Sequence, residues 1–175
     1  MHPLIFSIGK LLESSTGTRE DYSFDGPVDF DGIEGASSIQ GKVQIMRLDD
    51  GVNVHTSAVT ISVVFQCQRC LKDFKRKVQV KNAERQFLIK APRQPEDIND
   101  LYLIDMKKHR IDLTEMLRQE IILHFPLIPV CSNHCQGICP HCGQNLNEAT
   151  CQCADEILKI QKDNKPLAAL KKLIK

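Results

Sequence analysis

Eight cysteines spaced like metal ligands constrain the fold of this 175-residue chain more than any other feature. Two of them form the motif Cys67-Gln-Arg-Cys70. The other six crowd one later stretch and are Cys131, Cys135, Cys139, Cys142, Cys151 and Cys153. A structural zinc ion takes four thiolates in a tetrahedron, and a Cys-x-x-Cys turn supplies two of them from one tight loop. The spacing therefore predicts two four-thiolate sites, occupied by zinc or by another thiolate-binding metal such as iron.

The order of the cysteines favours one particular division into two sites. Cys139-Pro-His-Cys142 is followed by Gly143, whose backbone freedom lets N–H groups point at sulfur. The pair Cys151-Gln-Cys153 lies just beyond this turn, so we expect these four cysteines to form a local site.

The four remaining cysteines are left for a second site, formed by Cys67, Cys70, Cys131 and Cys135. This site would close a loop of about sixty residues and fix the relative position of two elements. An exchange of partners among the six clustered cysteines is the alternative, with His134 and His141 as substitute ligands.

The composition indicates where the chain resides. Cysteine makes up about 5% of the residues, below the roughly 8–10% that is typical of disulfide scaffolds. The segment from Leu4 to Ile8 is too short for a signal core and lacks a basic leader. No stretch approaches the roughly 20 apolar residues of a membrane span. We therefore expect a reducing, cytoplasmic compartment, no membrane partner, and cysteines that bind metal rather than form disulfides.

Alternating hydrophobicity predicts extended segments before and after the first cysteine pair. The strongest runs from Val52 to Gln66 and places Val59, Ile61, Val63 and Phe65 on one face. A second runs from Ile39 to Leu48, a weaker one from Tyr22 to Asp31, and Asp49-Asp50-Gly51 is a hairpin signal. The alternation resumes from Phe74 to Val80, beyond the cysteine turn.

A helix is predicted after residue 112. Asp112-Leu-Thr-Glu115 has the pattern of a capping box, with Asp112 as N-cap and Glu115 reaching back to the N-terminus. Pro126 ends this helix. Its expected core stripe consists of Leu113, Met116, Leu117, Ile121 and His124. We also expect a loop over residues 91–100 and short helices over 154–161 and 167–175.

Basic residues concentrate beside the first cysteine pair, although the whole chain carries a formal charge of only +1. The candidate RNA-binding residues are Arg69, Lys72, Lys75, Lys77 and Lys81. A row of lysines on a strand either contacts nucleic-acid phosphates or is a solvated face that protects a sheet edge, and the sequence leaves both interpretations open.

Together these patterns predict an α+β fold. We expect a mostly antiparallel sheet, open or partly closed as a barrel, with helices and a C-terminal zinc-knuckle module. The expected division is a sheet-plus-helix body over residues 1–126 and a cysteine-rich module over 127–175 packed on it. The alternative is two loosely coupled domains that meet near residue 100.

No catalytic pattern stands out. A catalytic zinc keeps one open position, whereas four thiolates leave none. There is no phosphate-binding loop of the Walker type, no Gly-x-Gly-x-x-Gly motif and no recognisable Ser/His/Asp arrangement. We therefore expect a protein that is not an enzyme and has no small-molecule substrate.

Four segments resemble one known family. They are Phe65-Gln-Cys67-Gln-Arg-Cys70-Leu71, the helix end Phe125-Pro-Leu-Ile-Pro-Val130, the run Cys135-Gln-Gly-Ile-Cys139-Pro-His-Cys142-Gly-Gln-Asn-Leu-Asn147 with Cys151-Gln-Cys153, and Pro166-Leu-Ala-Ala-Leu170-Lys. In this order they resemble the YceD-like family, the large ribosomal RNA subunit accumulation proteins. The resemblance implies a ribosome-biogenesis protein needed for normal levels of large-subunit ribosomal RNA, and it brings no catalytic residues.

The expected function is support of the accumulation, processing or stability of large-subunit ribosomal RNA. The expected partners are ribosomal RNA or a pre-ribosomal particle, and ribosomal proteins. One alternative is an adaptor that recruits a nuclease or a ribosomal protein without touching RNA, in which the acidic stretch from Glu13 to Glu34 matters. Another is a chaperone in which oxidation of the cysteines ejects zinc.

Overall fold

The computed structural model describes residues 3–91 and 101–153 of the chain. The chain divides into two compact units. Unit 1 comprises residues 1–65 and 75–127, and unit 2 comprises residues 66–74 and 128–175. The boundary near residue 100 of the two-domain alternative borders residues 92–100, which lie outside the described part of the chain. The loop expected over 91–100, apart from its first residue, and the helices expected over 154–161 and 167–175 lie outside the described residues.

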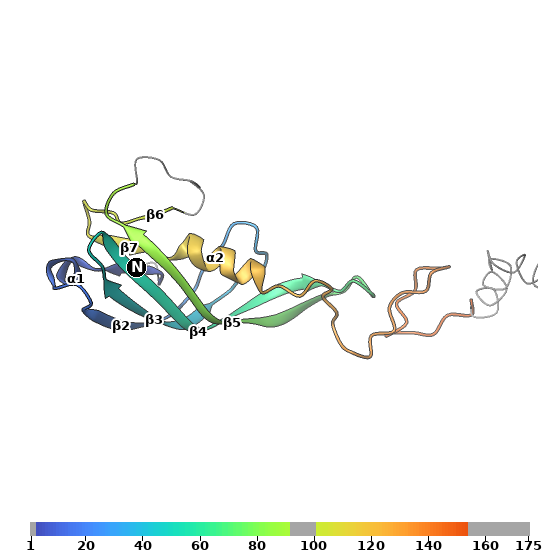
Figure 1. Cartoon of the computed structure of the whole chain (residues 1–175). Coiled ribbons are helices and arrows are strands. Elements are labelled where there is room, and N and C mark those ends of the chain that lie inside the picture. Colours follow the sequence, from blue (N-terminus) through green and yellow to red (C-terminus); the bar gives the residue numbers. More distant parts are fainter. Residues whose placement is uncertain (1–2, 92–100, 154–175) are drawn as a thin grey trace, which may run out of the picture. The chain divides into compact units, whose positions relative to one another are not determined.

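Unit 1 is built on a five-stranded sheet in the order β2-β3-β4-β5-β6 (Figure 1). The strands are β2 (Arg19–Gly26), β3 (Ile39–Arg47), β4 (Gly51–Gln66), β5 (Asp73–Leu88) and β6 (Tyr102–Leu103). β2 pairs antiparallel with β3 and β3 with β4, while β6 lies parallel to β5. The expected mixture of helix and mostly antiparallel strand is confirmed, but the sheet is open among the described residues, with β2 and β6 as its edges, so closure into a barrel is wrong.

The described residues of unit 1 also form two helices and a small second sheet. β1 (Ile5–Ser7) pairs antiparallel with β7 (Arg110–Asp112), and α1 (Gly9–Glu13) follows β1. α2 (Thr114–Leu123) lies across one face of the five-stranded sheet, as Figure 1 shows. Within the described part of the chain, no helix combines the length and the apolar character that crossing a membrane requires.

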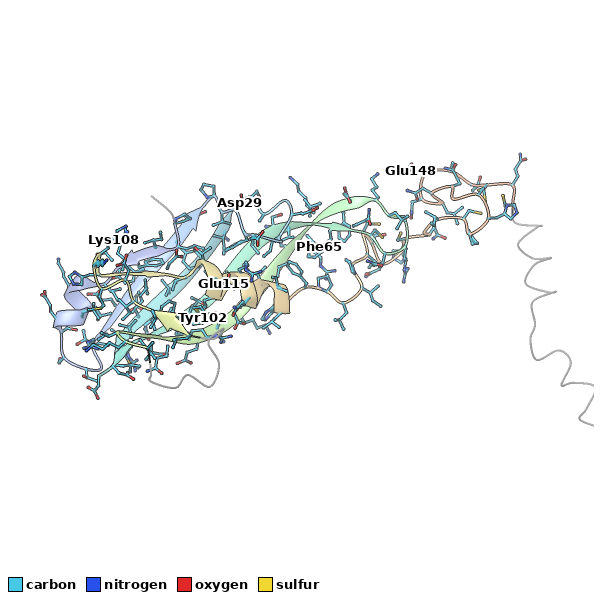
Figure 2. All side chains as sticks on the ribbon, turned by 90° about the horizontal axis from the view of Figure 1, so that it is seen from above. Asp29, Phe65, Tyr102, Lys108, Glu115 and Glu148 are labelled. Atoms are coloured by element: carbon cyan, nitrogen blue, oxygen red, sulfur yellow. The ribbon has the colours of Figure 1, made fainter. Side chains whose placement is uncertain are left out.

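The core of unit 1 lies between α2 and the inward face of the sheet. Val43 and Ile45 of β3 and Val59, Ile61 and Val63 of β4 are buried, as their alternation predicts. Phe65, labelled in Figure 2, is half-buried and packs edge-on against Phe125, with ring centroids 5.0 Å apart. The sheet therefore has one apolar face under α2 and one polar face turned outward.

A β-bulge interrupts β4 at a position that the alternation does not reveal. Val52, Val54 and Thr56 are buried, and then the parity changes so that Val59 is the next buried residue. Ala58 adopts a positive φ of 52°, and the register with β3 shifts between Gln40 and Lys42. One extra residue in β4 thus restores the inward direction of the following hydrophobic side chains.

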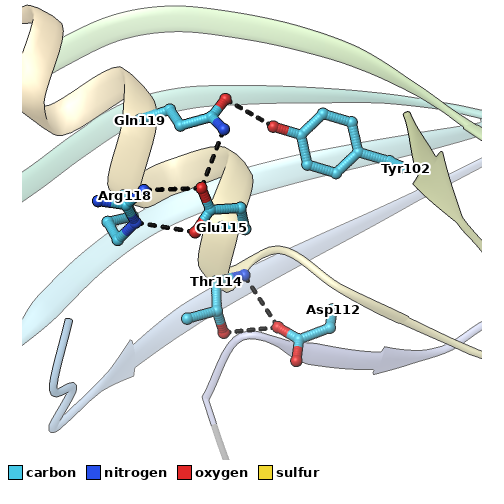
Figure 3. A network of polar contacts seen from close by, with 6 residues as sticks. All are labelled: Tyr102, Asp112, Thr114, Glu115, Arg118 and Gln119. Atoms are coloured by element: carbon cyan, nitrogen blue, oxygen red, sulfur yellow. Dashed lines mark hydrogen bonds and ion pairs between the residues drawn. The ribbon is translucent and has the colours of Figure 1, made fainter. Parts of the chain in front are cut away.

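The N-terminus of α2 differs from the predicted capping box, because Leu113 rather than Asp112 occupies the N-cap position. Figure 3 shows the polar contacts around it. Asp112 accepts hydrogen bonds from the backbone N–H (2.9 Å) and the hydroxyl (2.5 Å) of Thr114. Glu115 does not reach back, because its carboxylate accepts hydrogen bonds from Arg118 and Gln119 one turn later, at 2.8–2.9 Å. That contact to Arg118 holds the pKa of Glu115 below its ordinary value.

The helix otherwise follows its predicted stripe. Met116, Leu117 and Ile121 are buried, and the helix ends before Pro126. His124 is exposed rather than part of the core, since it stands at the C-cap where its Nδ1 lies 2.8 Å from the carbonyl oxygen of Glu120.

Candidate metal centres

The first candidate centre begins in the turn between β4 and β5. Its four members are Cys67, Cys70, Cys131 and Cys135. In the turn, the N–H of Leu71 donates to the carbonyl oxygen of Cys67 (2.9 Å), and Leu71 adopts a positive φ of 60°. This tight turn directs the Cys67 and Cys70 thiols to one side, where residues 128–135 bring the other two.

The sulfur geometry of this centre fits a tetrahedral metal ion. All four Sγ atoms lie within 4.8 Å of one another. The Sγ atoms of Cys67 and Cys135 are 3.8 Å apart, and those of Cys70 and Cys131 are 3.7 Å apart. Four sulfurs at the usual zinc–sulfur distance of about 2.3 Å in a tetrahedron lie about 3.8 Å apart, whereas a disulfide needs about 2.05 Å. The thiols are therefore placed as metal ligands.

Backbone N–H groups surround the first centre and favour thiolates in it. The N–H of Cys131 donates to the Sγ of Cys67 (3.4 Å). Burial alone raises the pKa of Cys67, but N–H groups of Cys70, Cys131 and Arg69 outweigh it and lower that pKa to about 6. At Cys131, by contrast, a hydrogen bond with Cys135 together with burial raises the pKa to about 12. A dication would be needed to hold all four as thiolates, since like charges so close repel one another.

The second candidate centre comprises Cys139, Cys142, Cys151 and Cys153, whose Sγ atoms also lie within 4.8 Å of one another. Gly143 has a φ of 73°, as the turn after Cys142 requires, and its N–H donates to the carbonyl oxygen of Cys139 (2.9 Å). N–H groups of Cys142 and His141 lower the pKa of Cys139 to about 6. A hydrogen bond with Cys142 and burial raise the pKa of Cys153 to about 12.

Both groupings are the ones that the spacing favours, and neither contains His134 or His141. The two centres differ in exposure. Cys67, Cys70 and Cys135 are buried in the first, whereas only Cys139 is buried in the second and Cys142 is exposed. With four thiolates each, both centres are closed to a substrate, which is the arrangement of structural rather than catalytic metal sites.

Asn147 links the two centres inside unit 2, a role that its sequence position does not signal. It belongs to the loop between Cys142 and Cys151, yet its Nδ2 donates to the Sγ of Cys135 in the first centre (3.5 Å). Its Oδ1 accepts from the N–H of Gln136 (2.8 Å). These two contacts tie the loop between Cys142 and Cys151 to the first centre.

The predicted basic residues fall into two sets. Arg69 and Lys72 have partners in unit 2: Arg69 donates to the carbonyl oxygen of Cys135 (3.3 Å), and Lys72 pairs with Glu148, labelled in Figure 2, at 3.4 Å. Lys75, Lys77 and Lys81 are exposed on β5 of unit 1. No carboxylate lies within ion-pair distance of these three among residues 3–91 and 101–153.

These observations define a class of protein. It has a mixed α/β unit with a mostly antiparallel sheet, and a second unit whose eight cysteines form two groups that could each hold a metal ion. The chain belongs to the YceD family, since its residues 56–174 match the family described as large ribosomal RNA subunit accumulation protein YceD. The resemblance read from the cysteine motifs is thereby confirmed.

Several curated proteins are similar to the chain. Uncharacterized proteins of Mycobacterium tuberculosis and Mycobacterium bovis are each 30% identical over 104 residues, which cover 59% of this chain and 49% of theirs. The chain thus spans about half the length of these relatives. A chloroplastic homologue of Arabidopsis thaliana, named for large ribosomal RNA subunit accumulation, is 35% identical over 46 residues, covering 26% of this chain and 14% of its own. No solved structure matches the chain significantly.

Proposed function

We propose that this chain supports the accumulation of large-subunit ribosomal RNA by contacting RNA, free or in a pre-ribosomal particle, without catalysing a reaction. The observation that carries the proposal is the set of exposed lysines on β5, Lys75, Lys77 and Lys81, which have no carboxylate partner among the described residues. Lysines without carboxylate partners are available to neutralise phosphates and release their counterions. Membership of a family named for ribosomal RNA accumulation also supports a role that involves ribosomal RNA.

Arg76, which the sequence-based selection omitted, is also exposed on β5, but it lies on the face of Val78 and Val80, opposite to Lys75 and Lys77, and so does not belong to this basic row. Arg69 and Lys72, by contrast, make contacts within unit 2. We therefore assign them a smaller share of RNA binding than the three lysines of β5.

We further propose that zinc fills both cysteine centres and that its role is to shape unit 2. The sulfur–sulfur distances of 3.7 and 3.8 Å support a tetrahedral thiolate site, although iron has the same preference for thiolates. We also propose that the protein works in a reducing compartment such as the cytoplasm, where paired cysteines more often bind metal than form disulfides.

Binding to a fragment of large-subunit ribosomal RNA tests the proposal. The triple substitution Lys75→Ala, Lys77→Ala and Lys81→Ala should weaken binding at least tenfold and flatten its salt dependence, because about three phosphate contacts are lost. The matched control replaces Lys10, Lys107 and Lys108, which are exposed elsewhere in unit 1, and removes the same charge. Equal affinity of the triple variant and the control would exclude β5 as the RNA surface.

An adaptor is the second candidate function, and one observation favours it. The loop between β2 and β3 carries the acidic residues Asp29, Asp31 and Glu34, which line an open recess of about 600 Å³. Such a recess suits a basic segment of a ribosomal protein. If the wild-type chain captured ribosomal proteins but bound no RNA, the adaptor would replace the RNA-contact proposal.

A further inference from the structure

The outward face of the sheet contains a small polar recess beside Lys77, one of the three β5 lysines proposed to contact RNA. It has a volume of about 140 Å³ and is lined by Ser38, Gln40, Thr60, Ile61, Ser62 and Lys77. Gln40 and Thr60 are direct partners across the β3–β4 pair, and Lys77 approaches from β5. Side chains from β3, β4 and β5 thus line the same recess on the polar face.

The lining combines one positive charge with neutral groups that both donate and accept hydrogen bonds. Lys77 is the charged member, and no carboxylate lines the recess. The side chains of Ser38, Gln40, Thr60, Ser62 and Lys77 form no hydrogen bond or ion pair with the described part of the chain. Their hydrogen-bonding capacity is therefore available to a ligand.

The size of the recess limits what can enter it. Pockets for drug-sized ligands measure about 300–1,000 Å³, so about 140 Å³ leaves room only for a small group such as a phosphate or a sugar hydroxyl. A whole nucleobase with its sugar does not fit.

The face around the recess is suited to contacting the backbone of a nucleic acid rather than its bases. Every Phe and Tyr side chain of β2 to β5 packs into a hydrophobic cluster: Tyr22, Phe24, Phe65, Phe74 and Phe87. Among the described residues, the outward face of these strands therefore has no Phe or Tyr for bases to stack on and keeps only the partly buried ring of His55, whereas stacking on several aromatic rings is the usual means of holding single-stranded bases.

The distribution of charge on the outward face favours β5 over β2 as the place where a nucleic acid binds. On the outward face, the exposed bases Lys75 and Lys81 follow β5, whereas the edge strand β2 carries the exposed acids Asp21 and Asp25 and one exposed base, Arg19. A polyanion is attracted along β5 and repelled from β2. The recess lies between them, on the β5 side of the register pair formed by Gln40 and Thr60.

We propose that this recess binds the phosphate and the 2′-hydroxyl of one nucleotide of RNA, with the rest of the ribose and the base outside it. Lys77 contacts the phosphate, and the hydroxyls of Thr60 and Ser62 with the carboxamide of Gln40 contact the ribose 2′-hydroxyl. A 2′-hydroxyl both donates and accepts hydrogen bonds, as these neutral groups do, and it is the group by which a protein distinguishes RNA from DNA. The inference rests on the proposed RNA contact and adds that the sheet selects RNA over DNA.

The test compares single-stranded RNA with DNA of the same sequence, using the whole chain with its metal content verified. Replacing Thr60 by Val and Ser62 by Ala leaves the net charge unchanged. We expect this pair of substitutions to lower RNA affinity about 5- to 20-fold, since two neutral hydrogen bonds are lost, with DNA affinity and the salt slope unchanged. Lys77→Ala should weaken RNA and DNA alike and reduce the magnitude of the salt slope by about 0.7.

The matched control replaces Ser23 and Ser57, which lie outside the recess lining, by Ala. RNA affinity within twofold of wild type for the Thr60/Ser62 variant, with the β5 lysine result intact, contradicts the recess and leaves the proposed function standing. Absence of RNA binding by the wild-type chain contradicts both. An unchanged thermal unfolding curve for each variant shows that the sheet is folded.

Discussion

Asn147 illustrates how one uncharged side chain can affect a metal centre to which it is not a ligand. Its amide donates to the Cys135 sulfur at 3.5 Å while its oxygen receives the N–H of Gln136 at 2.8 Å. Hydrogen bonds to a thiolate stabilise its charge and fix its direction, and such outer contacts commonly change metal affinity by 10- to 100-fold.

Asn147→Ala should therefore lower the affinity of the first centre for zinc about tenfold or more, because the Cys135 thiolate loses a donor. Competition with a chromophoric chelator, which resolves two metal ions of different affinity, measures the effect. Glu148→Gln is the control, since it removes only the exposed pair with Lys72 in the same loop. Equal metal affinities for the two variants would show that the contact at Asn147 is incidental.

For individual residues, the sequence predicts the cysteines that could bind metal better than it predicts the residues that contact those cysteines. The grouping of the cysteines follows from spacing, because Cys139 and Cys142 share one turn and Cys151 and Cys153 follow closely. The contact of Asn147 with Cys135 depends on how the loop folds over the first centre, and an Asn after a knuckle carries no such signal. The Thr60 and Ser62 hydroxyls likewise looked like the ordinary polar side of a strand.

Among the elements, α2 depends on a polar contact with β5 as well as on its buried stripe. The guanidinium of Arg85 lies 2.7 Å from the carboxylate of Glu120, whose side chain is only 11% exposed. An ion pair near the core costs desolvation when it forms, but removing one partner leaves the other charge poorly solvated. This contact fixes where the helix sits on the sheet.

Arg85→Ala should lower the free energy of unfolding of unit 1 by about 1–3 kcal/mol, because the Glu120 carboxylate is left half-desolvated. Arg118→Ala removes a base from the more exposed carboxylate of Glu115 and should cost only about 0.3–0.5 kcal/mol. Urea unfolding of both variants, followed by far-UV circular dichroism, makes the comparison. Equal losses would mean that the Arg85 contact is worth no more than a surface pair.

Element boundaries were predictable where the hydrophobic pattern is long. The strand expected from Val52 to Gln66 corresponds to β4 (Gly51–Gln66), and the hairpin at residues 49–51 joins it to β3. The bulge at Ala58 was not predictable, since alanine carries no preference for a positive φ. Strands of two or three residues, such as β6 and β1, are too short to show any alternation.

The two units are stabilised by different interactions. Unit 1 has an extended apolar core, whereas the buried cluster of unit 2 consists of Cys67, Cys70 and Cys135, with Phe74 and Val130 packed against it. A cluster made of metal ligands cannot replace a hydrophobic core when the metal is absent, because thiolates without a cation repel one another. The stability of unit 2 should therefore be the binding energy of its metal.

We expect the isolated protein to carry two zinc ions per chain, and a strong chelator to unfold unit 2 but not unit 1. Hydrogen exchange should then become fast in residues 66–74 and 128–153 while β4 and α2 stay protected. Elemental analysis gives the metal count, with Cys70→Ser and Cys142→Ser each expected to lower it by one. Protection of unit 2 that survived complete removal of metal would contradict this dependence.

The sequence-based division at residue 126 took unit 2 to be one continuous stretch, and the structure adds residues 66–74 to it. Those nine residues contain Cys67 and Cys70, whose expected site with Cys131 and Cys135 already linked them to the module. No domain boundary is visible around them, because β4 and β5 run into them from either side. Hydrophobic alternation also could not show whether the sheet closes into a barrel. It indicates which face of a strand is buried, but not whether the two edge strands pair with each other.

Because unit 2 is formed from two separate segments, its first cysteine centre cannot be complete until the second segment has been synthesised. Cys70 leaves the site of synthesis 61 residues before Cys131, the sulfur that it faces at 3.7 Å. At about 5–20 residues per second this interval lasts roughly 3–12 s, during which the hairpin of β4 and β5 can form while its two thiols lack their partners. A metal ion captured early would be held by two ligands only, so each newly made chain passes through a period when oxidants and competing metals can reach a centre that is later buried.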